Sequence, residues 1–136
     1  MANKVFVDAG AWIALANRRD KYHTNAKEQY QTLLSEKRQL VTTNLVVAEA
    51  YALIRRSGGH APAMRFLRAL RQSTRLRKIY SDAALEDVAE NLLDRFSDQS
   101  FSFVDAASFA LMEKEEIKQA FAFDQHFITA GFVLLP

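Results

Sequence analysis

Hydrophobic residues in this chain fall into short continuous runs and into longer stretches where they recur at helical spacing. The first run, Val5 to Val7, is bounded on both sides and rich in β-branched residues, which is typical of a fully buried strand. Four further short segments predict strands, at Leu40–Thr42, Arg77–Tyr80, Ala120–Phe123 and Phe132–Leu135.

Between these segments, apolar residues three to four positions apart predict amphipathic helices. We expect Asn44 to cap a helix over Leu45–Arg56 that stops at Gly58-Gly59, and Pro62 to lie in the first turn of the next helix. The remaining helices are predicted at Gly10–Asn17, Tyr22–Lys37, from Ser81-Asp82 onward, at Phe103–Lys114 and at Gln125–Thr129. This alternation predicts a three-layer α/β/α sandwich around a mostly parallel sheet of about five strands.

Length and composition place the chain among ordinary globular proteins. Its 136 residues suit one compact domain, and no linker, repeat or low-complexity stretch divides residues 1–136. No apolar window is long enough for a transmembrane helix, and the N-terminus lacks the pattern of a signal peptide. The absence of cysteine excludes disulfides and thiolate metal sites, and fits a cytoplasmic protein.

The net charge of +2 conceals an uneven layout. Residues 50–81 hold eight Lys and Arg and no acid, whereas residues 82–136 hold eleven Asp and Glu against three Lys and Arg. An acidic site beside a basic surface suits a polyanion that is handled through a metal ion. The eight basic residues can follow an RNA backbone, although a solvated helix face or a partner-binding surface explains them equally well. They are Arg55, Arg56, Arg65, Arg68, Arg71, Arg75, Arg77 and Lys78.

Three aspartates stand at the ends of predicted elements. Asp8 follows the first strand, Asp124 follows Ala120–Phe123, and Asp105 opens a helix. Each has an ordinary explanation as a helix cap, and the spacing of Ser102 and Asp105 matches a capping box. In an open α/β sheet, however, ligands bind beyond the carboxyl ends of the strands, where Asp8 and Asp124 are expected.

Glu49 cannot be explained as a cap. It is the only charge in the apolar run Leu45–Leu53 and lies more than one turn inside its helix. An unpaired buried carboxylate is costly, so Glu49 needs a Lys or Arg partner, a hydrogen-bond donor or a metal ion.

Taken together, the four acids predict a metal site. Two carboxylates about 4–5 Å apart repel by about 3–4 kcal/mol at an effective dielectric near 20, so four of them need a counter-charge. An all-oxygen ligand set favours Mg²⁺ or Mn²⁺ over zinc, and such an ion supports phosphodiester hydrolysis. We expect Asp8, Asp105 and Asp124 to be ligands, and Glu49 to be a ligand or to orient the attacking water. A phosphatase with an aspartyl-phosphate intermediate is disfavoured because Gly10 stands where a second acid is usual.

The chain resembles the PIN-domain nucleases, and specifically the VapC-like toxins of toxin–antitoxin pairs, over essentially its whole length. The resemblance rests on the segments VFVDAGAWIALANRRDKYH, TTNLVVAEAYALIRR, FSDQSFSFVDAASFALM and AFAFDQHFITAGFVLLP. It implies an α/β/α sandwich, a metal-dependent ribonuclease, a homodimer and a cognate antitoxin. It places the acidic residues of the family on Asp8, Glu49, Asp105 and Asp124.

One departure from the family pattern leaves an alternative open. The family commonly has Thr-Ser or Thr-Asn after the first acid, where this chain has Ala9-Gly10, so a hydroxyl is missing. The alternative is a degenerate, non-catalytic module that binds RNA or a protein partner. Ser102 remains as a nearby hydroxyl, and Asp98 is either an acid at the rim of the cleft or a solvated loop residue.

Two further sets of residues have competing explanations. His126 can act as a general acid or contact a phosphate, but a packed or exposed histidine is the more ordinary explanation. Trp12, Tyr22, Phe66 and Phe101 to Phe109 are predicted to belong to the core or a dimer interface rather than to stack on bases.

Overall fold

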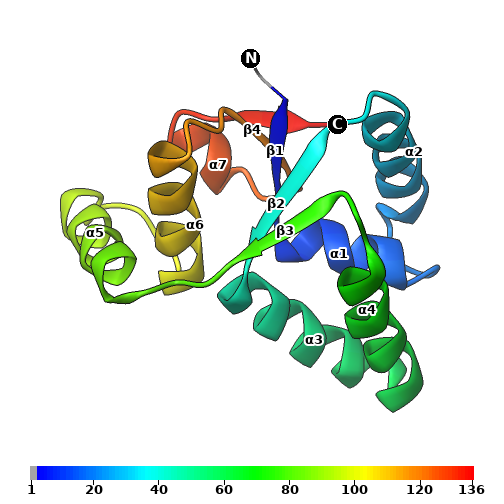
Figure 1. Ribbon diagram of the computed structural model, residues 1–136. Coiled ribbons are helices and arrows are strands. Elements are labelled where there is room, and N and C mark those ends of the chain that lie inside the picture. Colours follow the sequence, from blue (N-terminus) through cyan, green and yellow to red (C-terminus); the bar gives the residue numbers. More distant parts are fainter. Residues whose placement is uncertain (1–2) are drawn as a thin grey trace.

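The computed structural model describes residues 3–136 and contains a five-stranded, fully parallel sheet (Figure 1). The strands lie in the order β3-β2-β1-β4-β5. They are β1 (Lys4–Val7), β2 (Gln39–Thr43), β3 (Leu76–Ile79), β4 (Gln119–Phe121) and β5 (Val133–Leu135).

Helices cover both faces of this sheet (Figure 1). Crossovers between parallel strands are right-handed, so a chain that moves outward from β1 to β3 and then returns to β4 must change faces. The first four helices therefore lie on one side and the last three on the other, and the predicted α/β/α sandwich is confirmed. The helices are α1 (Ala9–Ala16), α2 (His23–Ser35), α3 (Asn44–Gly58), α4 (His60–Gln72), α5 (Ala83–Arg95), α6 (Phe103–Lys114) and α7 (His126–Thr129).

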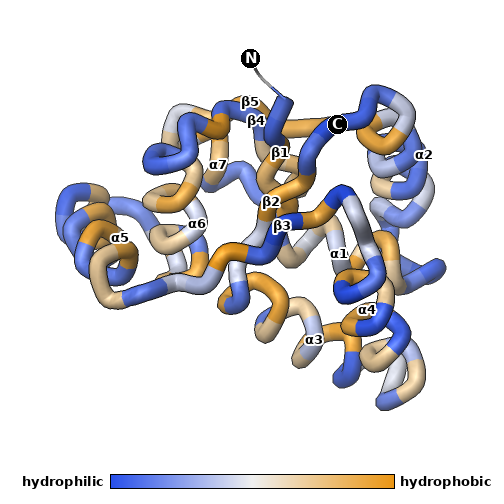
Figure 2. Tube along the Cα trace, in the orientation of Figure 1, coloured by the Kyte–Doolittle hydropathy of each residue, from blue (hydrophilic) through white to orange (hydrophobic). Residues whose placement is uncertain are grey.

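The core lies on both faces of the central strand. Val5, Phe6 and Val7 of β1 are fully buried, as expected for a strand flanked by helices on both sides. Figure 2 shows hydrophobic residues gathered along the central strands, while much of α2 and α4 is hydrophilic. No helix within residues 3–136 is long and apolar enough to cross a membrane.

The sheet has its topological switch point between β1 and β4. Val7 pairs with Phe121, and the backbone N–H of Asp8 continues this pairing by donating to the carbonyl oxygen of Phe121 at 3.1 Å. The chain leaves β1 toward one face of the sheet and leaves β4 toward the other, which opens a crevice beyond their carboxyl ends. This crevice is where the fold brings ligand-binding side chains together.

Two local predictions were wrong. The cap of α3 is Thr43 rather than Asn44: Thr43 still has the extended backbone of β2, and its hydroxyl accepts the N–H of Val46 at 3.1 Å. Asn44 is the first helical residue, and its side-chain oxygen instead accepts the N–H of Ser81 at 2.8 Å. Strand β4 ends at Phe121, so Asp124 lies three residues beyond it and not at its end.

Replacing Thr43 by alanine tests the assignment of the cap. The Thr43 side chain is fully buried, so its loss leaves the Val46 N–H without a partner, and we expect about 1–2 kcal/mol less free energy of unfolding. Thr32→Ala removes an exposed threonine of α2 and should change stability by less than about 0.5 kcal/mol. Urea denaturation measures both variants, and equal effects would show that Thr43 is not a significant cap.

Candidate active site

Asp8 is a buried carboxyl at the switch point. It occupies the N-cap position of α1, but its side chain makes no capping hydrogen bond to the helix, so a capping role does not explain it. Only 7% of Asp8 is exposed, and burial raises its pKa to about 7. The N–H of Ala9 opposes this shift, while the negative charges of Asp105, Glu49 and Asp124 add to it, in that order.

Glu49 enters the same crevice from α3, in the second turn of that helix. It is half-buried, less than the apolar run around it predicts, because this side of α3 borders the crevice. Burial is the main cause that raises the pKa of Glu49, followed by the charges of Asp105 and Asp124. Within residues 3–136, no Lys or Arg forms an ion pair with Glu49, so the cationic partner considered from the sequence is not found.

Asp105 has two roles at once. The predicted capping box is formed: Ser102 Oγ accepts the N–H of Asp105, and Asp105 Oδ2 accepts the N–H of Ser102, both at 3.0 Å. The same Oδ2 atom lies 3.0 Å from Nδ1 of His126, inside the crevice. The capping box therefore fixes the orientation of a carboxylate that also belongs to the site.

Asp124 and His126 reach the crevice from the turn that leads into α7. Asp124 Oδ1 accepts the backbone N–H of His126 at 2.9 Å, and it lies 3.4 Å from the Nδ1 atom of that ring. The next residue, Phe127, is fully buried and packs edge-on against Phe109, with 5.0 Å between ring centroids. This anchor holds the turn in place, so that His126 stands between Asp105 and Asp124.

His126 is the site residue that sequence reasoning underrated. Ligand atoms of Asp105, Asp124 and His126 all lie within 4.8 Å of one another. Its separation from Asp124 by one residue was the available signal, because a tight turn brings side chains two positions apart to one side. In contrast, Asp98 is exposed in the turn after α5 and makes no contribution to the pKa of Asp8.

The donor set of the crevice suits a divalent cation. Carboxylate oxygens are the ligands that Mg²⁺ and Mn²⁺ prefer, and Mn²⁺ also accepts an imidazole nitrogen. The raised pKa of the buried Asp8 carboxyl shows that its negative charge is poorly compensated by the surrounding protein. Among the described residues, His126 is the one basic side chain in ion-pair distance of these acids. The residues therefore fit a bound metal ion on their own chemistry.

The basic stretch lies away from the core of the protein. Most of its members are exposed, and only Arg75 is half-buried. They belong to the last turns of α3, to the outer face of α4 and to the region of β3. One of them, Arg77, contacts Glu115 at 3.3 Å.

Comparison with known families gives a match over nearly the whole chain. The model of the PIN domain family matches residues 5–133. The 23S rRNA-specific endonuclease VapC20 of Mycobacterium tuberculosis is 40% identical over 129 residues, which cover 95% of this chain and 95% of that protein.

Solved structures give the same picture. The crystal structure of Mycobacterium tuberculosis VapC20, a Sarcin-Ricin loop cleaving toxin, superposes with a TM-score of 0.87 and covers 95% of this chain and 96% of that one. VapBC2 from Rickettsia felis, bound to a DNA fragment from its promoter, has a TM-score of 0.70 at 12% identity and covers 96% of each chain. At that identity the second likeness shows the fold alone.

Asp8→Asn should stabilise the metal-free protein in a pH-dependent way. Because the pKa of Asp8 is higher in the folded than in the unfolded chain, its contribution to stability is complete below about pH 4 and is lost as the pH rises through 7. Asparagine is neutral throughout, so the variant should gain up to about 4 kcal/mol at pH 8 and little at pH 4. Thermal melting in EDTA at both pH values measures this. An equal difference at the two pH values would contradict it, and the exposed Asp98→Asn is the matched control.

Proposed function

Because this chain belongs to the PIN domain family, we propose that it is a metal-dependent endoribonuclease that hydrolyses RNA phosphodiester bonds, and the toxin of a toxin–antitoxin pair. The observation that carries the proposal is the meeting of four carboxylates from separate segments in one crevice, where Asp8 is buried and forms no ion pair with any side chain of residues 3–136. The 40% identity to a 23S rRNA-specific endonuclease over nearly the whole chain supports RNA as the substrate.

In this proposal Asp8, Asp105 and Asp124 hold a divalent cation, Mg²⁺ or Mn²⁺. When bound, such an ion neutralises phosphate charge, lowers the pKa of a water molecule and stabilises the leaving oxygen. Glu49 comes from α3 and is more exposed than Asp8, so it is either a further ligand or the residue that orients the attacking water. Its raised pKa makes this carboxylate a better proton acceptor than an ordinary glutamate.

His126 supports the cluster as a positioning residue. Its Nδ1 atom lies at 3.0 Å from Asp105 and at 3.4 Å from Asp124, so one ring holds two carboxylates in a fixed relation. The ring itself packs edge-on against Phe101, with 5.1 Å between ring centroids. A short turn of helix thus fixes two of the proposed ligands.

The partners and cellular setting belong to the same proposal. A cognate antitoxin, a homodimer and a cytoplasmic location are what the VapC-like resemblance implies. A single PIN-like domain over residues 1–136 is supported by one continuous sheet that runs from Lys4 to Leu135.

Loss of one proposed ligand should abolish RNA cleavage. We expect Asp124→Asn to remain folded and to cut a mixed RNA pool at least about a hundredfold more slowly in Mg²⁺, because the variant lacks one of the carboxylates that would hold the metal ion. Each tenfold loss of rate corresponds to about 1.4 kcal/mol of transition-state stabilisation. EDTA should abolish cleavage by the parent protein, and Asp98→Asn should cut at the parent rate. A folded Asp124→Asn variant that cleaves like the parent would refute the assignment.

The departure at Ala9-Gly10 favours one alternative, a degenerate module that binds RNA without cleaving it. A Cβ atom added at Gly10 would meet no heavy atom within 4 Å, so a serine can be accommodated there.

Gly10→Ser therefore tests whether the missing hydroxyl limits catalysis. If the chain is an active nuclease, we expect this variant to fold and to cleave RNA at the parent rate or faster. Gly10→Ala is the matched control for the gain in helix propensity, which is about 1 kcal/mol. Cleavage that only the Gly10→Ser protein shows would favour the degenerate module for the natural chain.

A further inference from the structure

Tyr80 is the most exposed large hydrophobic residue that the structure describes, with 65% of its surface accessible. It follows β3 directly, at one edge of the sheet. A single exposed apolar side chain needs no explanation by itself. The position of Tyr80 and the residues around it, however, explain why this ring is exposed.

Tyr80 stands at the same end of the sheet as the acidic crevice. Ile79 pairs with Thr43 at the end of β2, and the hydroxyl of Thr42 donates to the carbonyl oxygen of Val7 at the end of β1. Neighbouring strands lie about 4.8 Å apart, so the ends of β1 and β3 are separated by about 10 Å. A few nucleotides span this distance.

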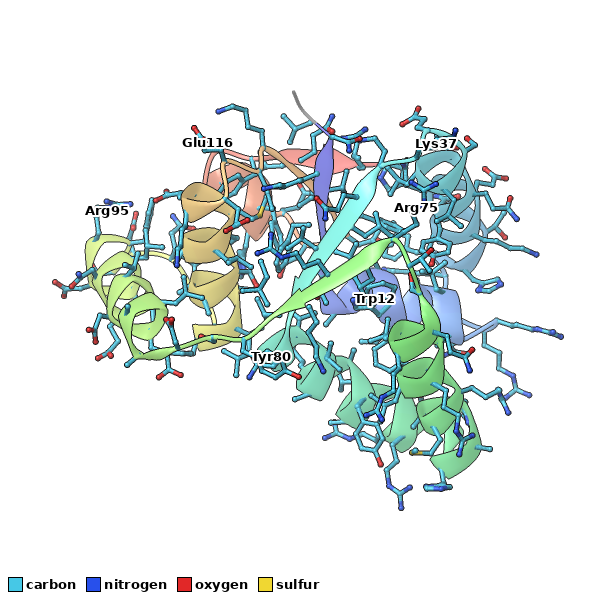
Figure 3. All side chains as sticks on the ribbon, in the orientation of Figure 1. Trp12, Lys37, Arg75, Tyr80, Arg95 and Glu116 are labelled. Atoms are coloured by element: carbon cyan, nitrogen blue, oxygen red, sulfur yellow. The ribbon has the colours of Figure 1, made fainter. Side chains whose placement is uncertain are left out.

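Helix α3 contacts the segment that carries Tyr80 and also carries Glu49 of the acidic crevice. Asn44 at the start of α3 accepts the N–H of Ser81, the residue after Tyr80, at 2.8 Å. Glu49 lies further along the same helix. Figure 3 shows Tyr80 beyond the end of β3, beside the beginning of α3.

The surroundings of the ring are cationic. The ammonium group of Lys78 lies 5.0 Å from the centroid of the Tyr80 ring, and the ring keeps most of its surface open to solvent. Both residues line a groove of about 390 Å³ between β3, α3 and α4. Its other charged side chain, Arg71, is also positive and exposed, and the remaining lining is apolar, including Val47 and Leu67.

We propose that Tyr80 stacks on an unpaired base of the RNA substrate, while Lys78 and Arg71 contact the phosphates beside that base. An exposed aromatic ring flanked by cations is the combination that binds single-stranded nucleic acid, because the ring meets the base and the cations meet the backbone. A base within an RNA duplex is already stacked on its neighbours, so this subsite selects RNA that is unpaired next to the cleavage position. The inference rests on the proposed ribonuclease function.

The test is RNA binding by variants of Tyr80 in the Asp8→Asn background, which should not cleave. Fluorescence anisotropy with a labelled single-stranded RNA, and with the duplex of the same sequence, gives the Kd of each. We expect Tyr80→Ala to weaken binding of the single strand about tenfold or more and to leave duplex binding nearly unchanged. Tyr80→Phe keeps the ring and should bind within about twofold of the parent. Val88→Ala, at an exposed residue of α5 away from this groove, is the matched control.

The outcomes separate this inference from the proposed function. If Tyr80→Ala binds the single strand like its parent, or if Tyr80→Phe is as weak as Tyr80→Ala, the stacking role is wrong. A change in oligomeric state for Tyr80→Ala, with RNA affinity retained, would identify the groove as a protein interface and overturn the inference. Cleavage of mixed RNA by the protein with natural Asp8 decides the function independently, since it can persist when Tyr80 has no role.

Discussion

Negative charge that the protein itself does not neutralise, held in the crevice between β1 and β4, is the feature on which the rest of the site depends. The parallel sheet creates the crevice, because the chain leaves these two neighbouring strands toward opposite faces. Asp8 then stands at its floor, where burial, together with smaller contributions from the other acids, raises its pKa to about 7. A buried carboxylate of this kind lowers the stability of the folded protein when no cation is bound, and a bound cation offsets this cost.

The protein tolerates this concentration of acids by giving several of them a second, structural role. Asp105 completes the capping box of α6, and Asp124 accepts a backbone N–H in the turn that precedes α7. His126 then connects the two carboxylates, while Phe127 anchors the turn in the core. The ordinary capping explanations and the metal-site explanation are therefore not exclusive, since one carboxylate has room for both kinds of contact. Within residues 3–136, neither Asp8 nor Glu49 makes a helix-capping hydrogen bond or an ion pair, and the N–H of Ala9 only partly opposes the burial that raises the pKa of Asp8.

Much of this arrangement could be predicted from the sequence, because strand runs, helix periodicity and the order of elements determine a parallel sheet. The convergence of Asp8 and Glu49 followed from that topology and from the isolation of Glu49 in an apolar run. The capping role of Thr43 was missed because it depends on where β2 ends. The last residue of that strand is the one whose hydroxyl faces the first turn of α3. His126 was considered from the sequence, but its contact with Asp105 and Asp124 was not predicted, because that contact depends on a tight turn and on how deeply Phe127 is buried, and neither has a periodic signature.

The most direct measurement of the unneutralised charge is calorimetric titration of the metal-free protein with Mn²⁺ at several pH values and in buffers of different ionisation enthalpy. If Asp8 holds a proton with a pKa of about 7, Mn²⁺ binding near pH 6.5 must release protons, and its affinity must rise as the pH approaches 8. Binding that releases no protons and has the same affinity at every pH, or no binding at all, would contradict a crevice whose carboxylates are neutralised by a bound cation.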